Sequence, residues 1–481
     1  MIDVKDSIRA VCIVQAMQND NPESPIPEFD AQMLNRYGVN GPRYTSYPTA
    51  PQFHTGFTSD DYRDAVVRSN REGGPLSVYV HVPFCRTVCF YCACNKVITA
   101  NYARAEAYLH QLEREIELQA RLFDTSRVVE QLHFGGGTPT YLRMADMQRL
   151  LASLAQHFAL CTDDTREFSI EIDPRTTEPA DIAVLGDLGF NRVSLGVQDF
   201  DPRVQRAVNR IQSYDLTANI MDAARDNGFG SINLDLIYGL PHQTPESMAI
   251  TLDKVLDLAP ERLAVYNYAH LPQMFKVQRQ IDAEALPDGA AKLAMLELII
   301  GKLTGAGYVY IGMDHFALPD DELAIAYYDG SLQRNFQGYS TRAPLDLIGL
   351  GASAIGRVDD CHAQSLKDLE TYSAALDADR LPLWRGLRLS RDDRLRRDVI
   401  MSIMCRSGVE FAAVERNHGV VFKDYFTAEL QALQPLVDDG LCVIAEDGIR
   451  VTPRGRLLLR NIAMPFDAYL GETSVRYSRA I

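Results

Sequence analysis

The chain has 481 residues, 46% hydrophobic and 23% charged, which is typical of a globular protein with a large domain and a smaller one. No apolar run is long enough to cross a bilayer, so we expect no membrane-spanning segment. The 64 acidic against 48 basic residues give a formal net charge of -16, which repels polyanions and disfavours nucleic acid as a partner.

Residues 1–55 precede the first periodic segment, and we expect them to form an N-terminal extension and arm. The opening MIDVKDSIRAVCIVQAM has acidic residues ahead of its apolar run and no small-residue cleavage site after it. We therefore expect no secretory signal and a cytoplasmic location. The stretch NGPRYTSYPTAPQF, at 40–53, is rich in turn formers and indicates an extended arm.

Between residues 56 and 375, short β-rich runs alternate with stretches whose apolar residues recur at helical spacing. This alternation predicts an α/β fold of parallel strands and crossover helices, either an open doubly wound sheet or a complete or partial barrel. Candidate reactive residues near the strand ends favour the barrel. The predicted strands are 76–82, 131–137, 167–173, 191–197, 231–240 and 262–271, with 308–316 as a further candidate.

From residue 376 to 481 the pattern changes to a smaller, mostly helical domain. The stretches 391–408 and 425–440 have helical periodicity, and 441–462 predicts a β-hairpin turning at Asp447-Gly448 followed by a helix. A wing-like hairpin of this kind can bind DNA, but the acidity of the chain favours a role as a lid or docking domain.

Four of the nine cysteines lie within HVPFCRTVCFYCACNK, at Cys85, Cys89, Cys92 and Cys94. Three thiolates spaced four and three residues apart can bind three corners of an iron–sulfur cube and leave one iron open. A zinc site would usually take four ligands from two separated pairs, and a disulfide is the plainer alternative. We expect Cys85, Cys89 and Cys92 to be the ligands. Cys94 lies only two residues after Cys92, so it would have to fold back sharply to bind the same cluster, and we expect it to lie near the cofactor instead. The alternatives are that Cys94 is a fourth ligand or a buried thiol without a role.

The spacing C-x3-C-x2-C, with Tyr91 before the third cysteine, resembles the radical S-adenosylmethionine superfamily. Further motifs, including GPRYTSYPTA, HFGGGTPTYL, EIDPR, NRVSLGVQDF, NLDLIYGLP and RNFQGYST, resemble the family of oxygen-independent coproporphyrinogen III oxidases, from about Phe29 to the C-terminus. The resemblance implies a partial (β/α)6-type radical SAM barrel. It also implies a [4Fe-4S] cluster and two molecules of S-adenosyl-L-methionine, one of them chelating the open iron.

The same resemblance assigns cofactor contacts to residues near the strand ends. The matching positions are Tyr79, Tyr91, Cys94, Gly136, Gly137, Thr138, Glu171, Gln198, Arg210, Asp235, Ala269 and Ile355. Among them Glu171 is matched to the first cofactor, and Gln198, Arg210 and Asp235 to the second.

Each assignment has a plainer alternative. The glycine run could be only a turn, although it lacks the lysine of a phosphate loop and the spacing of a dinucleotide fingerprint. Glu171 could be a strand-end carboxylate paired with Arg175, and Ala269 and Ile355 could be core residues. Asp235 lies inside an apolar run, where an unpaired carboxylate is costly, and this favours a functional partner.

Arg43 in the arm is a candidate for the carboxylates of the substrate, with a solvated surface arginine as the alternative. Phe336 and Gln337 match a segment expected to reach the active site. The resemblance implies oxidative decarboxylation of two propionate side chains of coproporphyrinogen III to vinyl groups. The product would be protoporphyrinogen IX, formed through a 5′-deoxyadenosyl radical in haem biosynthesis.

We expect a monomer that uses an electron donor and an electron acceptor which the sequence does not identify. Three other functions stay open. A haem-binding chaperone would share the barrel and the first three cysteines but lack Cys94 and the arm motif. A radical methyltransferase acting on porphyrins would form a methylated product. A simple electron carrier would need neither the barrel nor an open iron.

Overall fold

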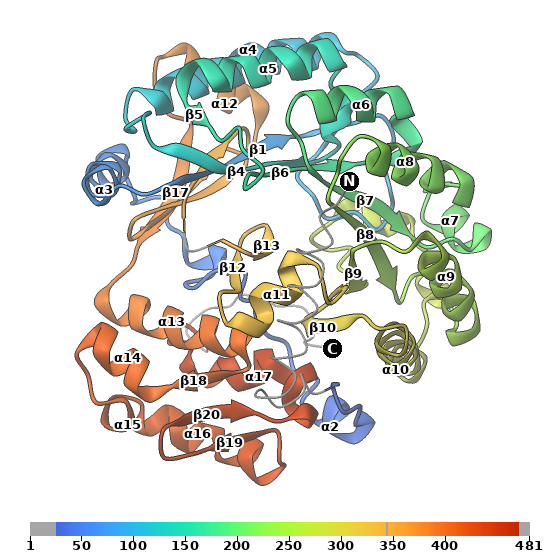
Figure 1. Ribbon diagram of the computed structural model, residues 1–481, viewed down its shortest axis with the longest axis vertical. Coiled ribbons are helices and arrows are strands. Elements are labelled where there is room, and N and C mark those ends of the chain that lie inside the picture. The colour runs from blue at the N-terminus through green and yellow to red at the C-terminus, as the bar shows by residue number, and fades with distance from the viewer. Residues whose placement is uncertain (1–25, 343–344, 471–481) are drawn as a thin grey trace, which may run out of the picture. The chain divides into compact units, whose positions relative to one another are not determined.

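The computed structural model describes residues 26–342 and 345–470. These residues belong to two compact units that are discontinuous in sequence (Figure 1). The barrel unit consists of Thr49–Leu296 and Pro344–Arg394, and the C-terminal unit of Met1–Pro48, Glu297–Ala343 and Leu395–Ile481. The two units interleave along the chain, whereas the sequence predicted domains that are continuous in sequence, with boundaries near residues 55 and 375. Those boundaries remain a prediction.

The barrel unit contains the predicted parallel strands, and the expectation of a (β/α)6-type partial barrel is confirmed. They lie side by side in chain order, from blue β1 to green β9 in Figure 1. Every neighbouring pair is parallel. The strands are β1 (Leu76–Val82), β4 (Val128–Gly136), β6 (Glu167–Ile172), β7 (Arg192–Gln198), β8 (Ser231–Tyr238) and β9 (Arg262–Asn267).

Crossover helices separate these strands along the chain and cover the outer face of the curved sheet (Figure 1). Some of them begin with the capping residues that sequence rules anticipate, as Ser213 does for α8 and Thr244 for α9. The helices are α4 (Ala103–Ala120), α5 (Met144–His157), α6 (Pro179–Asp187), α7 (Pro202–Ala207), α8 (Tyr214–Asp226), α9 (Pro245–Leu258) and α10 (Gly289–Gly305).

The sheet extends beyond β1 in a way that the periodicity did not predict. Strand β14 (Asp346–Leu350) pairs parallel to β1. Three antiparallel strands follow, β15 (Ile355–Val358), β16 (Cys361–Ser365) and β17 (Leu383–Arg388). Helix α3 (Ser59–Glu72) precedes β1, and α12 (Leu369–Asp377) lies between β16 and β17 in the sequence.

The C-terminal unit is mostly helical with short hairpins. The predicted hairpin is present as β19 (Cys442–Ile444) and β20 (Gly448–Val451), and β18 (Gly408–Glu410) adds an unpredicted third strand. The candidate strand 308–316 is instead an antiparallel hairpin, β10 (Val309–Gly312) with β11 (His315–Ala317). The remaining elements are α2 (Ala31–Arg36), α11 (Glu322–Asp329), β12 (Gln333–Asn335), β13 (Gly338–Ser340), α13 (Arg391–Arg406), α14 (Phe411–His418), α15 (Phe422–Tyr425), α16 (Thr427–Asp438) and α17 (Leu459–Ala463).

The N-terminal arm is built into the C-terminal unit. Asp30 forms an ion pair with Arg454, and its other carboxylate oxygen caps α2. The buried Tyr44 hydroxyl donates to Asp467 at 3.1 Å, and the Tyr47 hydroxyl accepts from the amide of Ala468 at 3.0 Å. The arm is therefore held by residues that come more than 400 positions later in the sequence. Asp30 and Arg454, for example, are 424 residues apart.

No helix among the described residues is long and apolar enough to span a bilayer.

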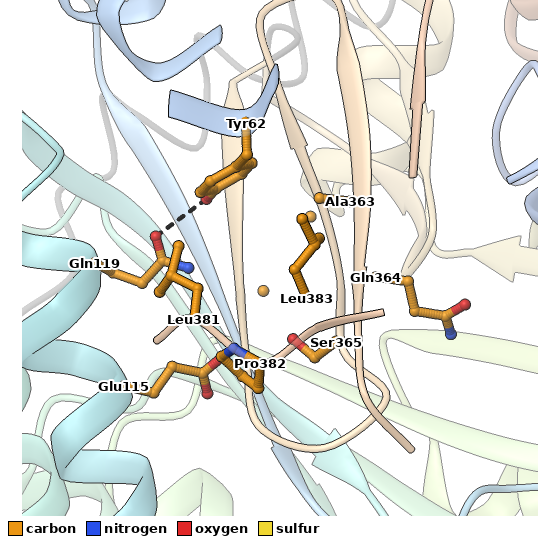
Figure 2. Close-up of a pocket in the computed structure, with 11 residues that line it drawn as sticks. Tyr62, Glu115, Gln119, Ala363, Gln364, Ser365, Leu381, Pro382 and Leu383 are labelled. Atoms are coloured by element: carbon orange, nitrogen blue, oxygen red, sulfur yellow. Dashed lines mark hydrogen bonds between the residues drawn. The ribbon is translucent and has the colours of Figure 1, made fainter. Parts of the chain in front are cut away.

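A small pocket of about 20 Å³ lies between α4 and the extended end of the sheet in the barrel unit (Figure 2). Glu115, which is fully buried, lines this pocket together with Gln119 and Ser365. The Glu115 Oε2 atom accepts hydrogen bonds from the Gly351 amide at 2.6 Å and from the Tyr372 hydroxyl at 2.7 Å. Glu115 thereby holds the turn that leads from β14 to β15.

Burial raises the pKa of Glu115 from 4.5 to about 7, even though these hydrogen bonds favour the charged form. Between those two pH values only the folded chain binds the proton. The contribution of Glu115 to stability is therefore complete below pH 4.5 and is lost as the pH rises toward 7.

We expect the Glu115→Gln variant to gain stability relative to the unsubstituted protein as the pH rises from 5 to 8. The gain should be of the order of 3 kcal/mol, because a neutral amide escapes the cost of ionising in the interior. Denaturation midpoints at several pH values measure this difference. Glu117→Gln on the same helix is the matched control, because the pKa of the exposed Glu117 is lowered by hydrogen bonds from Arg121 and Arg114. A pH-independent difference for Glu115→Gln would contradict the argument.

Candidate active site

Polar side chains cover one face of the parallel strands in the barrel unit. In β6 the apolar Phe168, Ile170 and Ile172 are buried, while Ser169 and Glu171 alternate with them and point to the opposite face. The register between strands places polar residues of that second face side by side. His133 of β4 pairs with Tyr79 of β1 and with Ser169 of β6, Glu171 pairs with Ser194 of β7, and Ser194 pairs with Asn233 of β8.

His133 connects three strands on this face. Its Nδ1 atom lies 2.5 Å from the Ser169 hydroxyl, and its Nε2 atom lies 3.4 Å from Glu171 Oε1. The ring stacks on Tyr79 with 5.8 Å between centroids and 14° between planes. His133 was not predicted from the sequence, although the period of two along β4 could have placed it on the same face as Gly135.

Glu171 is held from two sides. The Gly136 amide donates to Glu171 Oε2 at 3.1 Å, and His133 approaches the other oxygen. Burial acts to raise the pKa of Glu171, but these hydrogen bonds and the charges of His133 and His81 lower it below its usual value. The alternative that Glu171 pairs with Arg175 is wrong, because Arg175 pairs with Asp173 at 2.6 Å.

Gly135, Gly136 and Gly137 each lie so close to a different neighbour that a side chain at that position would clash with it. A Cβ at Gly135 would lie 2.9 Å from Glu171 Oε1, and one at Gly136, where φ is +120°, would meet the His81 ring at 2.7 Å. A Cβ at Gly137 would lie 2.8 Å from the carbonyl group of Pro83. The glycines therefore allow β4 to pack against the loop that carries the cysteines.

The cysteine loop begins at the short strand β2 (Phe84–Cys85) and ends at β3 (Val97–Ile98), which pair in parallel. The Thr99 amide donates to Cys85 O at 3.1 Å and closes the loop. The four thiols of this loop are free in the structure. Cys89 is buried, Cys85 and Cys92 are half-buried, and Cys94 is exposed.

Cations and hydroxyl groups surround the thiols. Arg175 Nη2 and Arg210 Nη1 lie 3.4 Å and 3.6 Å from Cys89 Sγ. The Thr138 hydroxyl lies 3.5 Å from Cys85 Sγ. A neighbouring thiol at Cys94 and the charge of Lys96, opposed by burial, lower the pKa of Cys92 to about 6. This donor set suits thiolates, because positive charge lies where their negative charge would be.

Among the described residues no three His, Cys, Asp or Glu side chains converge closely enough to hold one metal ion. In an iron–sulfur cube each cysteine binds a different iron, so the thiols need not converge on one point. Three thiols on one loop, with two guanidinium groups beside them, fit a [4Fe-4S] cluster.

Asp173 lies between the two arginines at the end of β6. Its carboxylate pairs with Arg175 at 2.6 Å and with Arg210 at 3.2 Å, and Arg210 also donates to Gly196 O at 2.5 Å. Burial acts to raise the pKa of Asp173, but the two guanidinium groups lower it. Asp173 was not among the predicted site residues, although EIDPR contains it, because one of its two partners, Arg210, comes from a distant segment.

Asp235 on β8 is half-buried and lies next to this face. Its carboxylate accepts from Asn233 Nδ2 at 2.9 Å and from the Ser194 hydroxyl at 3.2 Å. Burial, with the nearby charge of Glu171, raises the pKa of Asp235 to about 7. Gln198 ends β7 with φ of 70°, an uncommon conformation for a residue other than glycine that is often found at functional sites.

The remaining predicted residues fall into two groups. In the barrel unit Tyr91 packs on the hydrophobic cluster of Val204 and its neighbours, and Gln278 Nε2 donates to the carbonyl groups of Tyr91 at 2.9 Å and Ala269 at 3.3 Å. Ile355 begins β15. The C-terminal unit contains Arg43, which pairs with Asp314 at 2.5 Å, and the turn between β12 and β13, which contains Phe336 and Gln337.

Comparison with known proteins is consistent with this geometry. The model of the Radical SAM superfamily matches residues 79–255, and that of the HemN C-terminal domain matches residues 389–458. The chain is 50% identical to the oxygen-independent coproporphyrinogen III oxidase of Pseudomonas aeruginosa, over 94% of this chain and 99% of that one. It is 48% identical to the Escherichia coli enzyme of the same name, with the same coverage.

The structure also superposes on a solved structure with a TM-score of 0.88. That structure is of the coproporphyrinogen III oxidase (HemN) from Escherichia coli, described as a radical SAM enzyme. It is 47% identical in sequence, and the match covers 92% of this chain and 100% of that chain.

We expect Gly137→Ala to disrupt the cysteine loop, because the new methyl group meets the backbone of Pro83 and Phe84. The cost should be about 1–3 kcal/mol, seen as a lower unfolding midpoint and less iron per chain after anaerobic reconstitution. Gly135→Ala is the matched control, since its methyl group meets only the end of the Glu171 side chain. Equal iron contents in the two variants would show that Gly137 does not shape the loop.

Proposed function

The chain belongs to the family of oxygen-independent coproporphyrinogen III oxidases, and on that premise we propose how its described residues serve the reaction. The activity is the oxidative decarboxylation of two propionate side chains of coproporphyrinogen III to vinyl groups, which gives protoporphyrinogen IX. The observation that carries the proposal is the group of three thiols on one loop with the guanidinium groups of Arg175 and Arg210 beside Cys89.

Cys85, Cys89 and Cys92 hold a [4Fe-4S] cluster in this proposal, and one iron is left for S-adenosylmethionine. When bound, the cluster and S-adenosylmethionine supply a 5′-deoxyadenosyl radical that removes a hydrogen atom from the propionate β-carbon, after which carbon dioxide and an electron are lost. A radical is required because that carbon has no acidic hydrogen. Cys94 stays off the cluster and lies near the cofactor.

The chain's own residues position and neutralise the bound groups. Arg175 and Arg210 offset the negative charge of the cysteine ligands, and Asp173 keeps both guanidinium groups in place. Glu171, fixed by the Gly136 amide and His133, accepts hydrogen bonds from the first S-adenosylmethionine. Because its low pKa keeps Glu171 ionised, it is an acceptor at neutral pH.

Other residues of the same face serve both cofactor molecules. Tyr79, stacked on His133, contacts the first molecule, as do Tyr91 and Gly136 from the cysteine loop and β4. Ala269 and Ile355 flank the first molecule. The second molecule is contacted by Gly137, Thr138, Gln198, Arg210 and Asp235. Support for this second group comes from the positive φ of Gln198 and from the half-buried carboxyl group of Asp235, whose pKa is raised.

Arg43, Phe336 and Gln337 of the C-terminal unit contribute to substrate binding in this proposal. Arg43 would exchange its partner Asp314 for a substrate carboxylate, which an exposed ion pair allows at small cost. We further propose that the protein acts as a cytoplasmic monomer and exchanges electrons with a separate donor and a separate acceptor.

The proposed function is tested by anaerobic reconstitution of the protein with iron and sulfide, followed by incubation with coproporphyrinogen III, S-adenosylmethionine and a reductant. We expect 5′-deoxyadenosine together with a doubly decarboxylated porphyrinogen, measured by chromatography and mass spectrometry. A cluster-loaded sample that forms neither would contradict the oxidase. Tight haem binding without product would favour the chaperone, and a methylated porphyrin the methyltransferase.

Cysteine variants separate cluster ligands from Cys94. We expect Cys92→Ser to lose most of the iron and the cluster absorbance, because an alcohol is a poor ligand for iron in such cubes. Cys94→Ser should keep the iron content of the unsubstituted protein while its turnover falls. Iron analysis and electron paramagnetic resonance of both reconstituted variants give the comparison. An equal loss of iron in Cys94→Ser would identify Cys94 as a fourth ligand.

A further inference from the structure

Two cationic side chains of the barrel unit lie on the same indole ring. Lys367 Nζ lies 4.6 Å from the centroid of the Trp384 ring, and Arg385 Cζ lies 4.3 Å from it. Trp384 is the single tryptophan of the chain, at the start of β17, and Lys367 lies between β16 and α12. Trp384 and Arg385 are half-buried, whereas Lys367 is exposed.

Neither cation has an acidic partner among the described residues. The Arg385 hydrogen bond goes from Nε to Gln364 Oε1 at 2.8 Å, which leaves the two terminal nitrogens of the guanidinium group without a protein acceptor. The neighbouring Asp368 is occupied, because its carboxylate caps α12 through the amides of Glu370 and Thr371.

Two like charges placed together carry a free-energy cost. Burial lowers the pKa of Arg385, and burial together with the charge of Arg385 lowers the pKa of Lys367. The indole face offsets part of this cost by cation–π attraction, but it leaves both positive charges without a counter-charge. An anion bound between the two groups would remove the repulsion and use the free donors of the guanidinium group.

The cation pair is adjacent to the cysteine loop. Asn95, directly after Cys94, donates from Nδ2 to the Lys367 carbonyl oxygen at 3.3 Å. The Asn95 carbonyl oxygen lies 3.1 Å from His81 Nε2, on the polar face of β1. The backbone of Lys367 therefore contacts the loop that carries the proposed cluster ligands.

We propose that Lys367 and Arg385, which both contact the Trp384 ring, form a binding site for a propionate carboxylate of the porphyrinogen substrate. This inference rests on the proposed function and adds residues to it. Arginine can bind a carboxylate through two parallel hydrogen bonds and lysine supplies a second charge, while the indole ring keeps both cations in place. The half-buried position of Trp384 and Arg385 favours a small molecule over the flat surface of a protein partner.

The site is tested with coproporphyrin III, the stable and fluorescent oxidised form of the substrate, titrated into the cluster-loaded protein. We expect Arg385→Gln and Lys367→Gln each to weaken binding by about tenfold to a hundredfold, as for loss of a charged hydrogen bond. The tetramethyl ester of the porphyrin should bind weakly and equally to all variants. Arg63→Gln, an exposed arginine of α3 whose side chain is 59% accessible, is the matched control.

Iron content and the affinity for S-adenosylmethionine should not change in these variants, and Arg385→Lys should restore part of the binding. Unchanged coproporphyrin affinity in Arg385→Gln and Lys367→Gln would overturn the proposal. So would an equal loss of acid and ester binding, which would indicate packing rather than charge recognition.

A loss of turnover only with a protein electron donor, while turnover with a chemical reductant persists, would identify a docking surface instead and would also overturn the proposal. The proposed function fails separately, if the unsubstituted protein binds coproporphyrin but forms no decarboxylated product from coproporphyrinogen.

Discussion

The candidate site depends on one half-buried carboxylate, that of Asp173. Two guanidinium groups enclosed beside a thiol would repel each other and lose their hydration, and such a group is costly unless it is paired. Asp173 contacts both Arg175 and Arg210, and so lets them approach Cys89 together. The arrangement prepares positive charge for thiolate ligands before any cofactor arrives, and ties the end of β6 to the cysteine loop.

The parallel register of the strands positions the other polar side chains of the site. Because side chains alternate along a strand, one register brings Tyr79, His133 and Ser169 into a row, and Glu171 follows two residues later on the same face. A slip by one residue would turn this row toward the helices. The glycines of β4 then allow the row and the cysteine loop to meet at close range, so that chemistry and packing are set by the same strands.

The sequence predicted correctly those elements whose patterns lie within a short stretch of the chain. Strand periodicity and the spacing of the cysteines lie within short windows, and they led to the partial barrel and to three candidate ligands. The surroundings of Cys89 were missed, because Arg175 and Arg210 come from segments 86 and 121 residues away in the sequence. The pairing of Arg175 with Asp173, only two residues apart, was missed because Glu171 was considered as the partner of Arg175 instead. The antiparallel strands after β14 were not predicted, since they are short and do not follow the regular strand–helix alternation from which the other strands were inferred. Alternation along β6 could have identified Ser169 as a neighbour of Glu171.

The ion pair of Asp30 with Arg454 has a consequence for how the protein is made. Its partners are separated by 424 residues, and ribosomes add about 5–20 residues per second. The arm therefore waits roughly 20–85 s after its own synthesis before its binding partners emerge. During that interval the hydroxyl groups of the buried Tyr44 and Tyr47 lack their partners Asp467 and Ala468, so the arm completes its native hydrogen bonds only after those C-terminal residues have been made.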